Sequence, residues 1–321
     1  MTKNASVINI GIIGPGRVAE RHVNAINQIN NGRLWSIAGR NIEDTQCFAS
    51  KHNAQAEKNA FINISEMLSD PQLDAVIIAT PDKLHVKHIL LAVEANKSIL
   101  VEKPLCTDKN DGLEILQALE KFNKTFAIGY HLRWHDGLRQ IATKCRLSDF
   151  GKPRHLRLHW GVNFFDSNKW RTNPDYSRWL CLTVLGTHLI DVMRWLMVPQ
   201  CGEILNSNSI VSNTHQTLFD ETAVSSFQFE SGATAQIFCS ITLDAPFKLE
   251  LYTDNTTVIG NDLAGDERSI LIDNDPLIFK KNNPYIDQMN DFLRAIQENS
   301  KPEVGIIEGL KNIEHMLSIW Q

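Results

Sequence analysis

The sequence lacks a long apolar run, a cluster of basic residues and a paired-cysteine motif. No stretch approaches the roughly 18 uninterrupted apolar residues of a membrane-spanning helix, so no membrane partner is expected. The net charge is -5 and the Lys and Arg residues are scattered, which argues against a nucleic-acid-binding surface. The six cysteines form no C-x-x-C pair and no metal-like group with histidine, so we expect free thiols, no bound metal and a reduced, cytoplasmic compartment.

The chain is long enough for two domains. It has 321 residues, and a domain typically spans about 150. Its 43% apolar and 21% charged residues are typical of a globular protein, for which we expect a small-molecule partner. The apolar start, SVINIGII, has no basic stretch before it and no small-residue cleavage site after it. We therefore interpret it as a first strand rather than a signal peptide.

Short apolar runs alternate with helical patterns over the first 130 residues. The segments 17–29, 85–96 and 112–122 repeat apolar residues with helical spacing. Such alternation predicts a parallel sheet with right-handed crossovers, which binds ligands at the carboxyl ends of its strands. The strand candidates are 7–13, 34–38, 75–80, 98–101 and 125–128.

After about residue 150 the pattern changes. Apolar and polar side chains alternate strictly along 155–164, and two further runs joined by the turn ESG predict a hairpin. A largely antiparallel sheet with one polar face follows from this pattern. The candidates are strands 155–164, 222–229, 233–243 and 247–252, and helices 182–197 and 285–297 with another at the end of the chain.

The stretch GIIGPGRVAE contains the pattern G-x-G-x-x-A between a predicted strand and a predicted helix. Gly14 would form the tight turn, Gly16 would let the backbone approach a pyrophosphate, and Ala19 would let the helix pack closely. The first helical residues, Arg17 and Val18, would offer N–H groups at the positive end of the helix dipole. We predict a dinucleotide site, with a plain glycine turn as the alternative.

The end of the second strand bears on which dinucleotide binds. NAD sites usually place an acid there for the ribose 2'-hydroxyl, but this sequence has Gly39 and Arg40. A guanidinium suits a 2'-phosphate, so we predict NADP(H) over NAD(H). The alternative is that Arg40 is a solvated arginine and that Glu43 or Asp44 supplies the acid.

The stretch VEKPLCTD follows the apolar run SILV. Glu102, Lys103 and Pro104 therefore come at the carboxyl end of a strand, where the nicotinamide of a bound dinucleotide would lie. A lysine in a half-buried cleft loses hydration, which lowers its pKa, and a nearby nicotinamide cation lowers it further. Lys103 could then exchange a proton with a substrate hydroxyl. The alternative is a surface lysine paired with Glu102.

Three segments together resemble the Gfo/Idh/MocA oxidoreductases, the glucose-fructose oxidoreductase and inositol dehydrogenase family. They are the glycine pattern, residues 74–105 (DAVIIATPDKLHVKHILLAVEANKSILVEKPL) and residues 186–196 (GTHLIDVMRWL). The resemblance implies a Rossmann domain followed by a domain on a large open mixed sheet, whose exposed face commonly supports dimers or tetramers. It also implies hydride transfer between a nicotinamide and a secondary alcohol carbon, generally of a sugar, polyol or related compound.

The expected fold class is accordingly α/β. Residues 1–128 would form a Rossmann doubly wound parallel sheet that binds the dinucleotide. Residues 129–321 would form an α+β domain with a large open, mostly antiparallel sheet, which binds substrate and joins the chains of a homodimer or homotetramer.

The same resemblance assigns roles to individual residues. It makes Lys103 the lysine at the reaction centre and His188 the histidine that faces substrate, both candidates for moving a proton or orienting a hydroxyl. For His188 the alternative is a satisfied core histidine, because an apolar stripe runs beside it. The residues that it places in the cofactor cleft are Thr80, Pro81, His85 and Glu102.

One stretch departs from the family pattern. Many members carry glycines and then an aspartate four residues before the histidine, but here Arg178–Leu180 replace the glycines and Val184 replaces the aspartate. Loss of a general acid or base can lower a rate by roughly a hundred- to ten-thousandfold, so Val184 argues for impaired activity. Asp191, one turn beyond His188 on the same predicted helix face, could instead orient the imidazole.

Two segments, 129–136 and 169–179, are rich in Trp, Arg, His and Tyr. Such side chains stack on sugar rings and donate hydrogen bonds to hydroxyls, carboxylates or phosphates. The cations favour an anionic substrate such as a sugar acid or a nucleotide sugar, and aromatic packing with solvated arginines is the alternative. The predicted substrate contacts are His131, Arg133, Trp170, Arg171, Arg178 and Asp191.

The leading hypothesis is an NADP(H)-dependent dehydrogenase or reductase of a sugar-like alcohol, with NAD(H) as the second choice of cofactor. A cofactor-binding sensor or regulator that has lost turnover is the alternative, and Val184 favours it. A scaffold without cofactor would have no need of Gly14, Gly16 and Lys103 together. The fold alone does not separate these classes.

Overall fold

The computed structural model forms two compact units. The first contains the chain up to His131 together with Asn283–Leu310. The second contains Leu132–Asn282 and the chain from Lys311 onward. The structure describes residues 7–163, 170–215 and 218–320.

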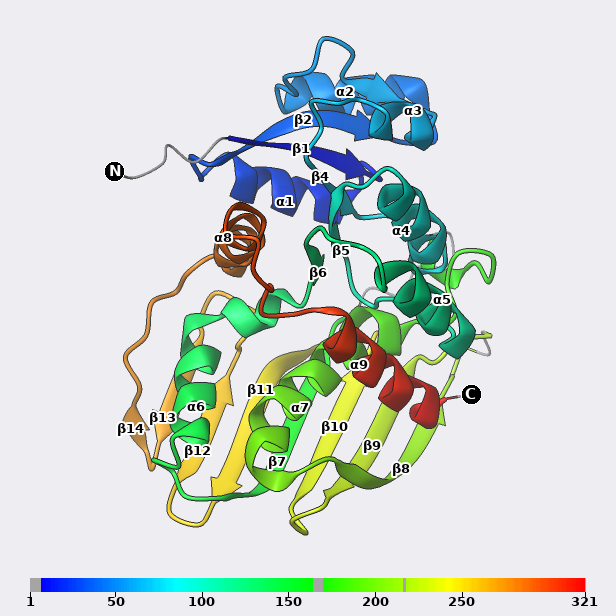
Figure 1. The fold of residues 1–321 in the computed structure, drawn as a ribbon. Helices are drawn as coiled ribbons and strands as arrows, with labels where there is room; N and C mark the ends of the chain where they lie inside the picture. The colour runs from blue at the N-terminus through cyan, green and yellow to red at the C-terminus, as the bar shows by residue number, and fades with distance from the viewer. Residues whose placement is uncertain (1–6, 164–169, 216–217, 321) are drawn as a thin grey trace, which may run out of the picture. The chain divides into compact units, whose positions relative to one another are not determined.

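The first unit is built on six parallel strands in the order β3-β2-β1-β4-β5-β6 (Figure 1). After β3 the chain returns to the other side of β1, so the direction of winding reverses between β1 and β4. Open α/β sheets bind ligands at such a reversal, outside the carboxyl ends of the strands. The strands are β1 (Ile8–Ile13), β2 (Gly32–Ala38), β3 (Ala60–Phe61), β4 (Ala75–Ile78), β5 (Ser98–Val101) and β6 (Phe126–Ile128).

The three helices predicted for the first 130 residues are present, and two more occur. The additional helices, α2 and α3, begin after Asn41 and Asn63, whose side chains accept hydrogen bonds from first-turn N–H groups. Apolar spacing does not identify α3, and it gives α2 no range, although Glu43 and Asp44 suit the first turn of a helix. The helices of this unit are α1 (Arg17–Ile26), α2 (Ile42–Lys51), α3 (Ile64–Leu68), a short 3₁₀ helix (Asp82–Leu84), α4 (His85–Glu94), α5 (Lys109–Leu119) and α8 (Pro284–Gln297).

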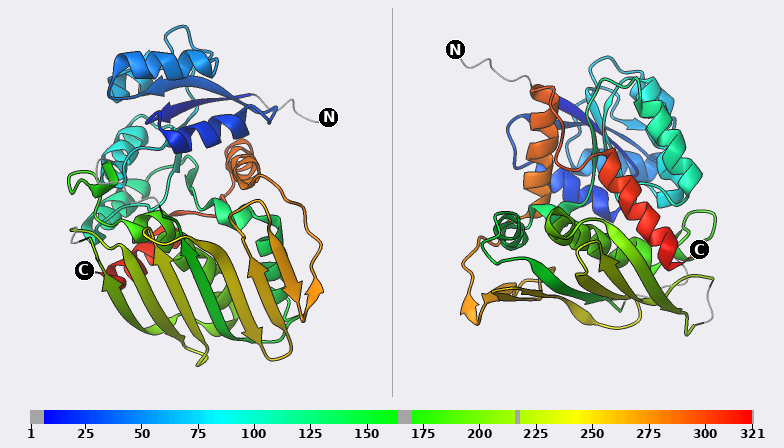
Figure 2. Two further views of the ribbon diagram at one scale, coloured as in Figure 1. Left: turned by 180° about the vertical axis from the view of Figure 1, so that it is seen from behind. Right: turned by 60° about the horizontal axis from the view of Figure 1, so that its bottom comes forward.

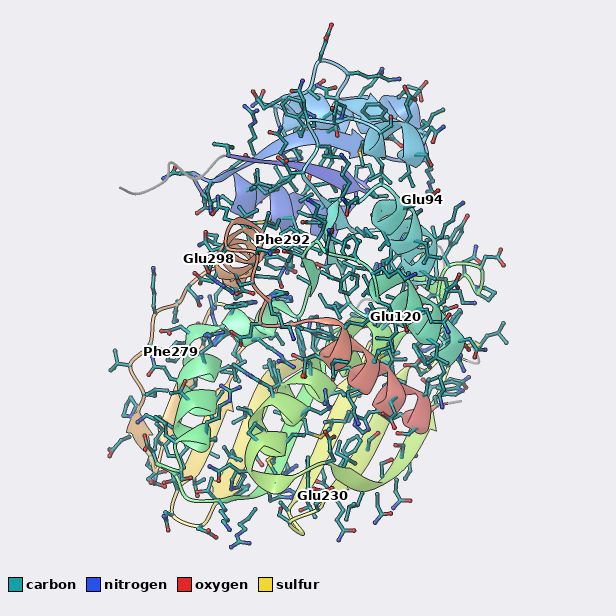
Figure 3. The ribbon with its side chains drawn as sticks, viewed as in Figure 1. Glu94, Glu120, Glu230, Phe279, Phe292 and Glu298 are labelled. Carbon is teal, nitrogen blue, oxygen red and sulfur yellow. The ribbon has the colours of Figure 1, made fainter. Side chains whose placement is uncertain are left out.

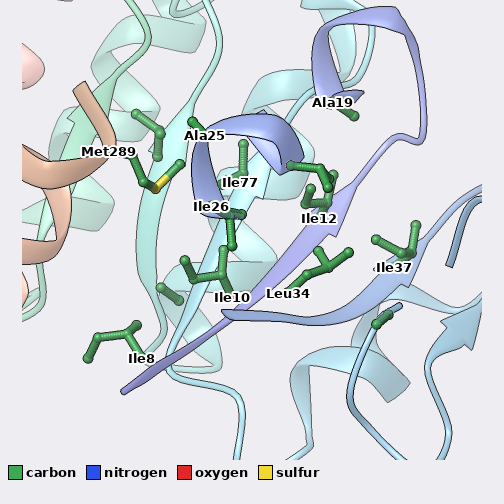
Figure 4. Packing of buried hydrophobic residues seen from close by; sticks show 14 of the residues in the cluster. Ile8, Ile10, Ile12, Ala19, Ala25, Ile26, Leu34, Ile37, Ile77 and Met289 are labelled. Atoms are coloured by element: carbon green, nitrogen blue, oxygen red, sulfur yellow. The ribbon is translucent and has the colours of Figure 1, made fainter. Parts of the chain in front are cut away.

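The core of the first unit includes α8, which comes from late in the sequence. All of β1 is buried, as in a central parallel strand. Figure 4 shows Met289 of α8 in one cluster with Ala25 of α1, because α8 packs against α1. Phe292 of α8, labelled in Figure 3, is also buried. This helix therefore belongs to the first unit although it falls in the predicted range 129–321, and the functional division at residue 128 stays a prediction.

The second unit is built on eight strands in the order β14-β13-β12-β11-β7-β10-β9-β8. Neighbouring strands pair antiparallel except β7 and β10, which run parallel. Together with the parallel sheet of the first unit, this sheet confirms the predicted fold class. The strands are β7 (Pro153–Gly161), β8 (Ile204–Ser212), β9 (Thr222–Phe229), β10 (Thr234–Ser240), β11 (Ala245–Thr253), β12 (Thr257–Asn261), β13 (Ser269–Ile272) and β14 (Asp275–Pro276).

Helices cover one face of this second sheet. Figure 1 shows α6 and α7 across that face, and Figure 2 shows the opposite face, over which no described helix lies. Strand alternation accounts for the difference, since Phe227 and Ile237 are buried whereas Val224 and Gln236 are exposed. The helical segments are His131–Trp134, α6 (Asp136–Arg146), Trp170–Thr172, a π-helix (Leu182–Gly186), α7 (Thr187–Cys201) and α9 (Ile306–Ile319), which contributes residues to both units.

Candidate active site

The loop after β1 has the conformation that the glycine pattern predicts. Gly14 has a φ of +97°, which other residues rarely adopt, and a Cβ there would lie 2.9 Å from a carbonyl oxygen after β4. No atom lies within 4 Å of the Cβ that Gly16 lacks. Gly16 is the N-cap of α1, and no side chain caps this helix. Ala19 is buried, as close packing of α1 requires. Because no side chain caps the helix, the N–H groups of Arg17 and Val18 lie at an open helix start, which would suit a pyrophosphate.

Arg40 follows β2, where an NAD site commonly places an acid. It is exposed, and no carboxylate among the described residues pairs with its guanidinium. Position 39 has no room for an acidic side chain, because a Cβ on Gly39 would collide with the hydroxyl of Thr45. Glu43 and Asp44 lie in the first turn of α2, where carboxylates are favoured by the helix dipole.

Lys103 lies at the carboxyl end of β5 with the buried side chain of Glu102 beside it. Glu102 Oε1 is 2.7 Å from His22 Nε2, and Oε2 accepts a 3.3 Å hydrogen bond from the Lys103 N–H. Burial opposes ionisation of Glu102, but the His22 hydrogen bond and the charges of His22 and Lys103 outweigh it, so its pKa is lowered. A buried carboxylate therefore lies next to the half-buried Lys103.

His85, which the resemblance assigns to the cofactor cleft, is held between main-chain groups. Its Nδ1 lies 2.8 Å from the carbonyl oxygen of Pro104, and its Nε2 lies 3.0 Å from that of Thr80. Burial lowers the pKa of His85, against the effect of these hydrogen bonds. The Thr80 hydroxyl is 3.0 Å from Nδ1 of His88, and Pro81 precedes the 3₁₀ helix. Contact of these residues with a cofactor stays a prediction.

His131 belongs to the first unit and lies near Lys103. Its ring stacks on Tyr285 of α8, with centroids 4.5 Å apart, and Tyr285 also meets His22 edge-on at 5.3 Å. Burial lowers the pKa of His131 to about 3; the Glu102 charge acts against this shift and the Lys103 charge adds to it. The imidazole of His131 is therefore neutral, and its contact with substrate stays a prediction.

His188 is the second residue of α7 in the second unit. It is buried, and its ring centroid lies 6.0 Å from that of Trp160 on β7. The preceding turn, Leu182–Gly186, is a π-helix rather than the predicted α-helix. A π-helix has more residues per turn than an α-helix, so α-helical spacing does not give the position of Val184 relative to His188. The prediction of an α-helix from residue 182 is therefore wrong over Leu182–Gly186, whereas His188 and Asp191 lie three residues apart within α7.

Arg133 and Asp191, both predicted to contact substrate, form a buried ion pair with each other. Arg133 donates from Nε and Nη2 to the two carboxylate oxygens at 2.9 and 2.7 Å. Asn312 donates a third hydrogen bond of 2.9 Å to Oδ1 of Asp191. This geometry favours a structural role for the pair, and contact of either residue with substrate stays a prediction.

The predicted cluster at 169–179 contains two cation–π pairs. The guanidinium of Arg171 lies 4.5 Å from the ring centroid of Trp170, and that of Arg178 lies 5.1 Å from that of Trp179. Trp170, Arg171 and Arg178 are half-buried, and Lys169 lies outside the described residues. The contact of this cluster with substrate stays a prediction.

Asp220, which belongs to no motif in the sequence, caps the start of the π-helix. Its carboxylate accepts hydrogen bonds from the N–H groups of Leu180 at 2.7 Å and Leu182 at 2.6 Å, and from the thiol of Cys181 at 3.1 Å. Burial raises the pKa of Asp220 to about 6, although these hydrogen bonds act in the opposite direction. Asp220 thus fixes the turn that leads to His188.

The raised pKa of Asp220 predicts a pH-dependent stability. The pKa of this carboxyl is about 6 in the folded state, against an ordinary value of 3.8. Its protonated form therefore stabilises the folded state fully below pH 3.8, and this contribution is lost as pH rises through 6. We expect the difference in free energy of unfolding, wild type minus Asp220→Asn, to fall by about 2 kcal/mol between pH 4 and 7. Urea unfolding of both proteins across this range measures it, and a pH-independent difference would contradict the assignment.

The contacts of His22, Tyr285 and Asp220 were not foreseen from the sequence. His22 had a usable signal, since it is a histidine on the apolar stripe of the first predicted helix. Tyr285 reaches this site from a helix late in the chain, and Asp220 acts on a segment that is distant in sequence. Neither of these two had a local signal.

The cysteines form no disulfide, and the side chains of the described residues form no metal-binding group. The six cysteines are free thiols, and Cys181 Sγ lies 3.6 Å from Cys239 Sγ in the core of the second unit. Among the described residues, no three His, Cys, Asp or Glu side chains are grouped so as to hold a metal ion. Within the same residues, no helix is both long and apolar enough to cross a membrane.

An open glycine turn at the switch point of a parallel sheet, with a lysine at the end of β5, is typical of a nicotinamide-dependent oxidoreductase. Residues 8–130 match the family described as "Oxidoreductase family, NAD-binding Rossmann fold", and residues 139–261 match the "GFO/IDH/MocA C-terminal domain". The chain therefore belongs to the Gfo/Idh/MocA family of oxidoreductases. This confirms the resemblance and the predicted enzyme class, an NAD(P)-dependent dehydrogenase or reductase.

Named relatives are similar over most of the chain. Myo-inositol 2-dehydrogenase of Thermotoga maritima is 23% identical over 94% of this chain and 92% of its own length. Glucose-6-phosphate 3-dehydrogenase of Bacillus subtilis is 23% identical over 75% of this chain and 71% of its own. The solved structure of aldose-aldose oxidoreductase from Caulobacter crescentus has a TM-score of 0.90 at 19% identity, covering 98% of this chain and 96% of that one. Levoglucosan dehydrogenase in complex with NADH and L-sorbose has a TM-score of 0.85 at 19% identity, covering 96% and 94%. The solved structures show a shared fold.

Proposed function

We propose that this protein is an NADP(H)-dependent oxidoreductase that transfers a hydride between the nicotinamide and a secondary alcohol or ketone carbon of a sugar, polyol, sugar acid or nucleotide sugar. The observation that carries the proposal is the half-buried Lys103 beside a buried carboxylate, at the same sheet edge as the open glycine turn. Relatives that are named as dehydrogenases of inositol and glucose 6-phosphate support the substrate class.

In this proposal the cofactor and the site residues have separate roles. The bound nicotinamide supplies the hydride chemistry. Lys103 exchanges the proton of the substrate hydroxyl, and His188 contacts the substrate as a second polar group. The open start of α1 holds the pyrophosphate. Arg171 and Arg178 would favour a substrate that carries a carboxylate or phosphate.

The preference for NADP(H) rests on the end of β2. Gly39 leaves no room for the acid that would select NAD(H), and Arg40 carries an exposed guanidinium without a carboxylate partner among the described residues. Glu43 and Asp44 are explained by their place in the first turn of α2. A charge-assisted contact between Arg40 and the 2'-phosphate would then select NADP(H).

Replacing Arg40 by alanine tests this preference. We expect Arg40→Ala to weaken NADPH binding by about ten- to hundredfold and to leave NADH binding nearly unchanged, because only NADPH carries the 2'-phosphate. Fluorescence titration with both cofactors measures the ratio, and Lys121→Ala, which removes an exposed cation elsewhere in the first unit, is the control. Equal losses for NADPH and NADH would refute the 2'-phosphate argument.

A screen of sugars, polyols, sugar acids and nucleotide sugars with NADP⁺ tests the reaction itself. The proposal predicts cofactor reduction with at least one secondary alcohol from these classes. Tight NADPH binding with no turnover in either direction would instead favour the sensor or regulator that Val184 suggested. Absence of binding to either cofactor would refute the proposal as a whole.

We also propose that the uncovered face of the second sheet joins copies of the chain into a homodimer or homotetramer in the cytoplasm. Ile210 of β8 and Val224 of β9 are paired in register on that face and are 76% and 42% exposed. Such apolar exposure is typical of an interaction surface. Sedimentation of the protein at several concentrations measures the oligomeric state.

A further inference from the structure

Two histidines contact the residues on either side of Lys103, and the reaction as proposed uses neither of them. His22 of α1 contacts the side chain of Glu102, which precedes Lys103. His85 of α4 contacts the main chain of Pro104, which follows it. Both histidines are almost completely buried, so each contact excludes water.

The His22 contact has a defined direction. An ionised carboxylate only accepts hydrogen bonds, so the Nε2 of His22 carries the hydrogen and donates it to Glu102 Oε1 at 2.7 Å. The other carboxylate oxygen accepts from the Lys103 N–H at 3.3 Å. A chain of two hydrogen bonds therefore connects α1 to the backbone of Lys103.

The His85 contact acts on the other side of the lysine. The carbonyl oxygen of Pro104 is 2.8 Å from Nδ1, and the carbonyl oxygen of Thr80 is 3.0 Å from Nε2. Carbonyl oxygens only accept, so a neutral His85 donates to one of them, and the shorter contact assigns its hydrogen to Nδ1. The ring thereby ties the turn after β5 to α4.

We propose that His22 and His85 are positioning residues that together fix the place of the Lys103 ammonium. One contact is to the residue before Lys103 and the other is to the residue after it, and they come from two different helices. The backbone at Lys103 therefore has little freedom to rotate. The inference rests on the proposed role of Lys103 in proton exchange. Accurate placement matters there, because a displacement of about 1 Å at a reacting group can lower a rate by roughly a hundredfold.

Asparagine and glutamine substitutions test whether the position of the donor nitrogen matters, and not only the size of the side chain. A glutamine amide nitrogen replaces the Nε2 of histidine, and an asparagine amide nitrogen replaces Nδ1. His22→Gln and His85→Asn are therefore matched variants that keep the donor to Glu102 and to Pro104. His22→Asn and His85→Gln are mismatched variants, which keep an amide but move it away from its acceptor.

Two readouts are needed, one of them independent of the substrate. The first is kcat and KM with NADPH and the substrate that the screen identifies. The second is the NMR signal of Lys103 in protein labelled with ¹³C at lysine Cε, assigned by its absence in Lys103→Arg. We expect matched variants to keep both readouts, and mismatched variants to lower kcat by about ten- to hundredfold with KM for NADPH nearly unchanged. In the mismatched variants the Lys103 signal should move toward that of exposed lysines.

Val23→Ala and Ile89→Val control for loss of stability. These residues lie on the same helices, α1 and α4, and are fully buried without polar contacts to the turn. They should lower stability while leaving kcat and the Lys103 signal unchanged. The inference is overturned if these controls lower kcat as much as the mismatched variants do, or if matched and mismatched variants behave alike.

The Lys103 signal distinguishes a wrong reaction from a wrong positioning role. If no substrate is turned over but mismatched variants alone shift the Lys103 signal, then the positioning holds and the assigned reaction is wrong. If the signal stays in place in every variant, then the positioning is wrong whatever the turnover.

Discussion

Replacement of Lys103 by methionine is expected to lower kcat by about a hundred- to ten-thousandfold with the substrate that the screen identifies. Methionine keeps the apolar stem but has no ammonium, so it neither takes up nor releases the hydroxyl proton. The turn around Lys103 should keep its shape, because its fixed contacts run through Glu102 and Pro104. Steady-state kinetics with NADPH measures the change.

Binding separates a chemical role for Lys103 from a structural one. NADPH affinity measured by fluorescence should change far less than kcat, as expected for a group that acts mainly in the transition state. Lys87→Met, which removes an exposed lysine from α4, should keep the activity of the wild type. Unchanged turnover in Lys103→Met would remove this lysine from the reaction.

The parts of the fold that the sequence predicts are those with local causes. Gly14 is needed because the turn has a positive φ, and β5 is recognisable because a buried parallel strand is apolar throughout. The second sheet shows itself in the alternation of apolar and polar residues along β7. These signals each lie within about ten residues.

The remaining features depend on contacts between distant segments. The sequence gives no local reason for α8 to pack against α1 or for Tyr285 to stack on His131. The π-helix before His188 likewise depends on Asp220, which supplies its cap from outside that segment. Helical spacing alone predicted an α-helix over this segment.

The pairing of Arg133 with Asp191 in the candidate site also depends on a contact between distant segments. Each residue alone suggested a substrate contact, because a cation near aromatic residues and an acid near His188 are common in sugar sites. The fold brings the two together, with Asn312 as a third partner. Their charges therefore satisfy each other in the interior of the second unit.

Asp191→Ala is expected to lower the free energy of unfolding by about 3–5 kcal/mol. The side chains of Arg133 and Asp191 are 5% and 1% exposed, so removal of the carboxylate leaves a buried guanidinium without its bidentate partner. Chemical denaturation of the variant and the wild type at the same pH measures the loss.

An exposed pair provides the comparison for Asp191→Ala. Arg157 and Glu250 are joined at 2.9 Å with side chains 53% and 27% exposed, and Glu250→Ala should change stability by at most about 1 kcal/mol. Replacing both members of the buried pair, in Arg133→Met with Asp191→Leu, should recover much of the loss, because no unpaired charge then remains in the interior. A stable Asp191→Ala protein with weakened substrate binding would show instead that this carboxylate serves the substrate, as the sequence suggested.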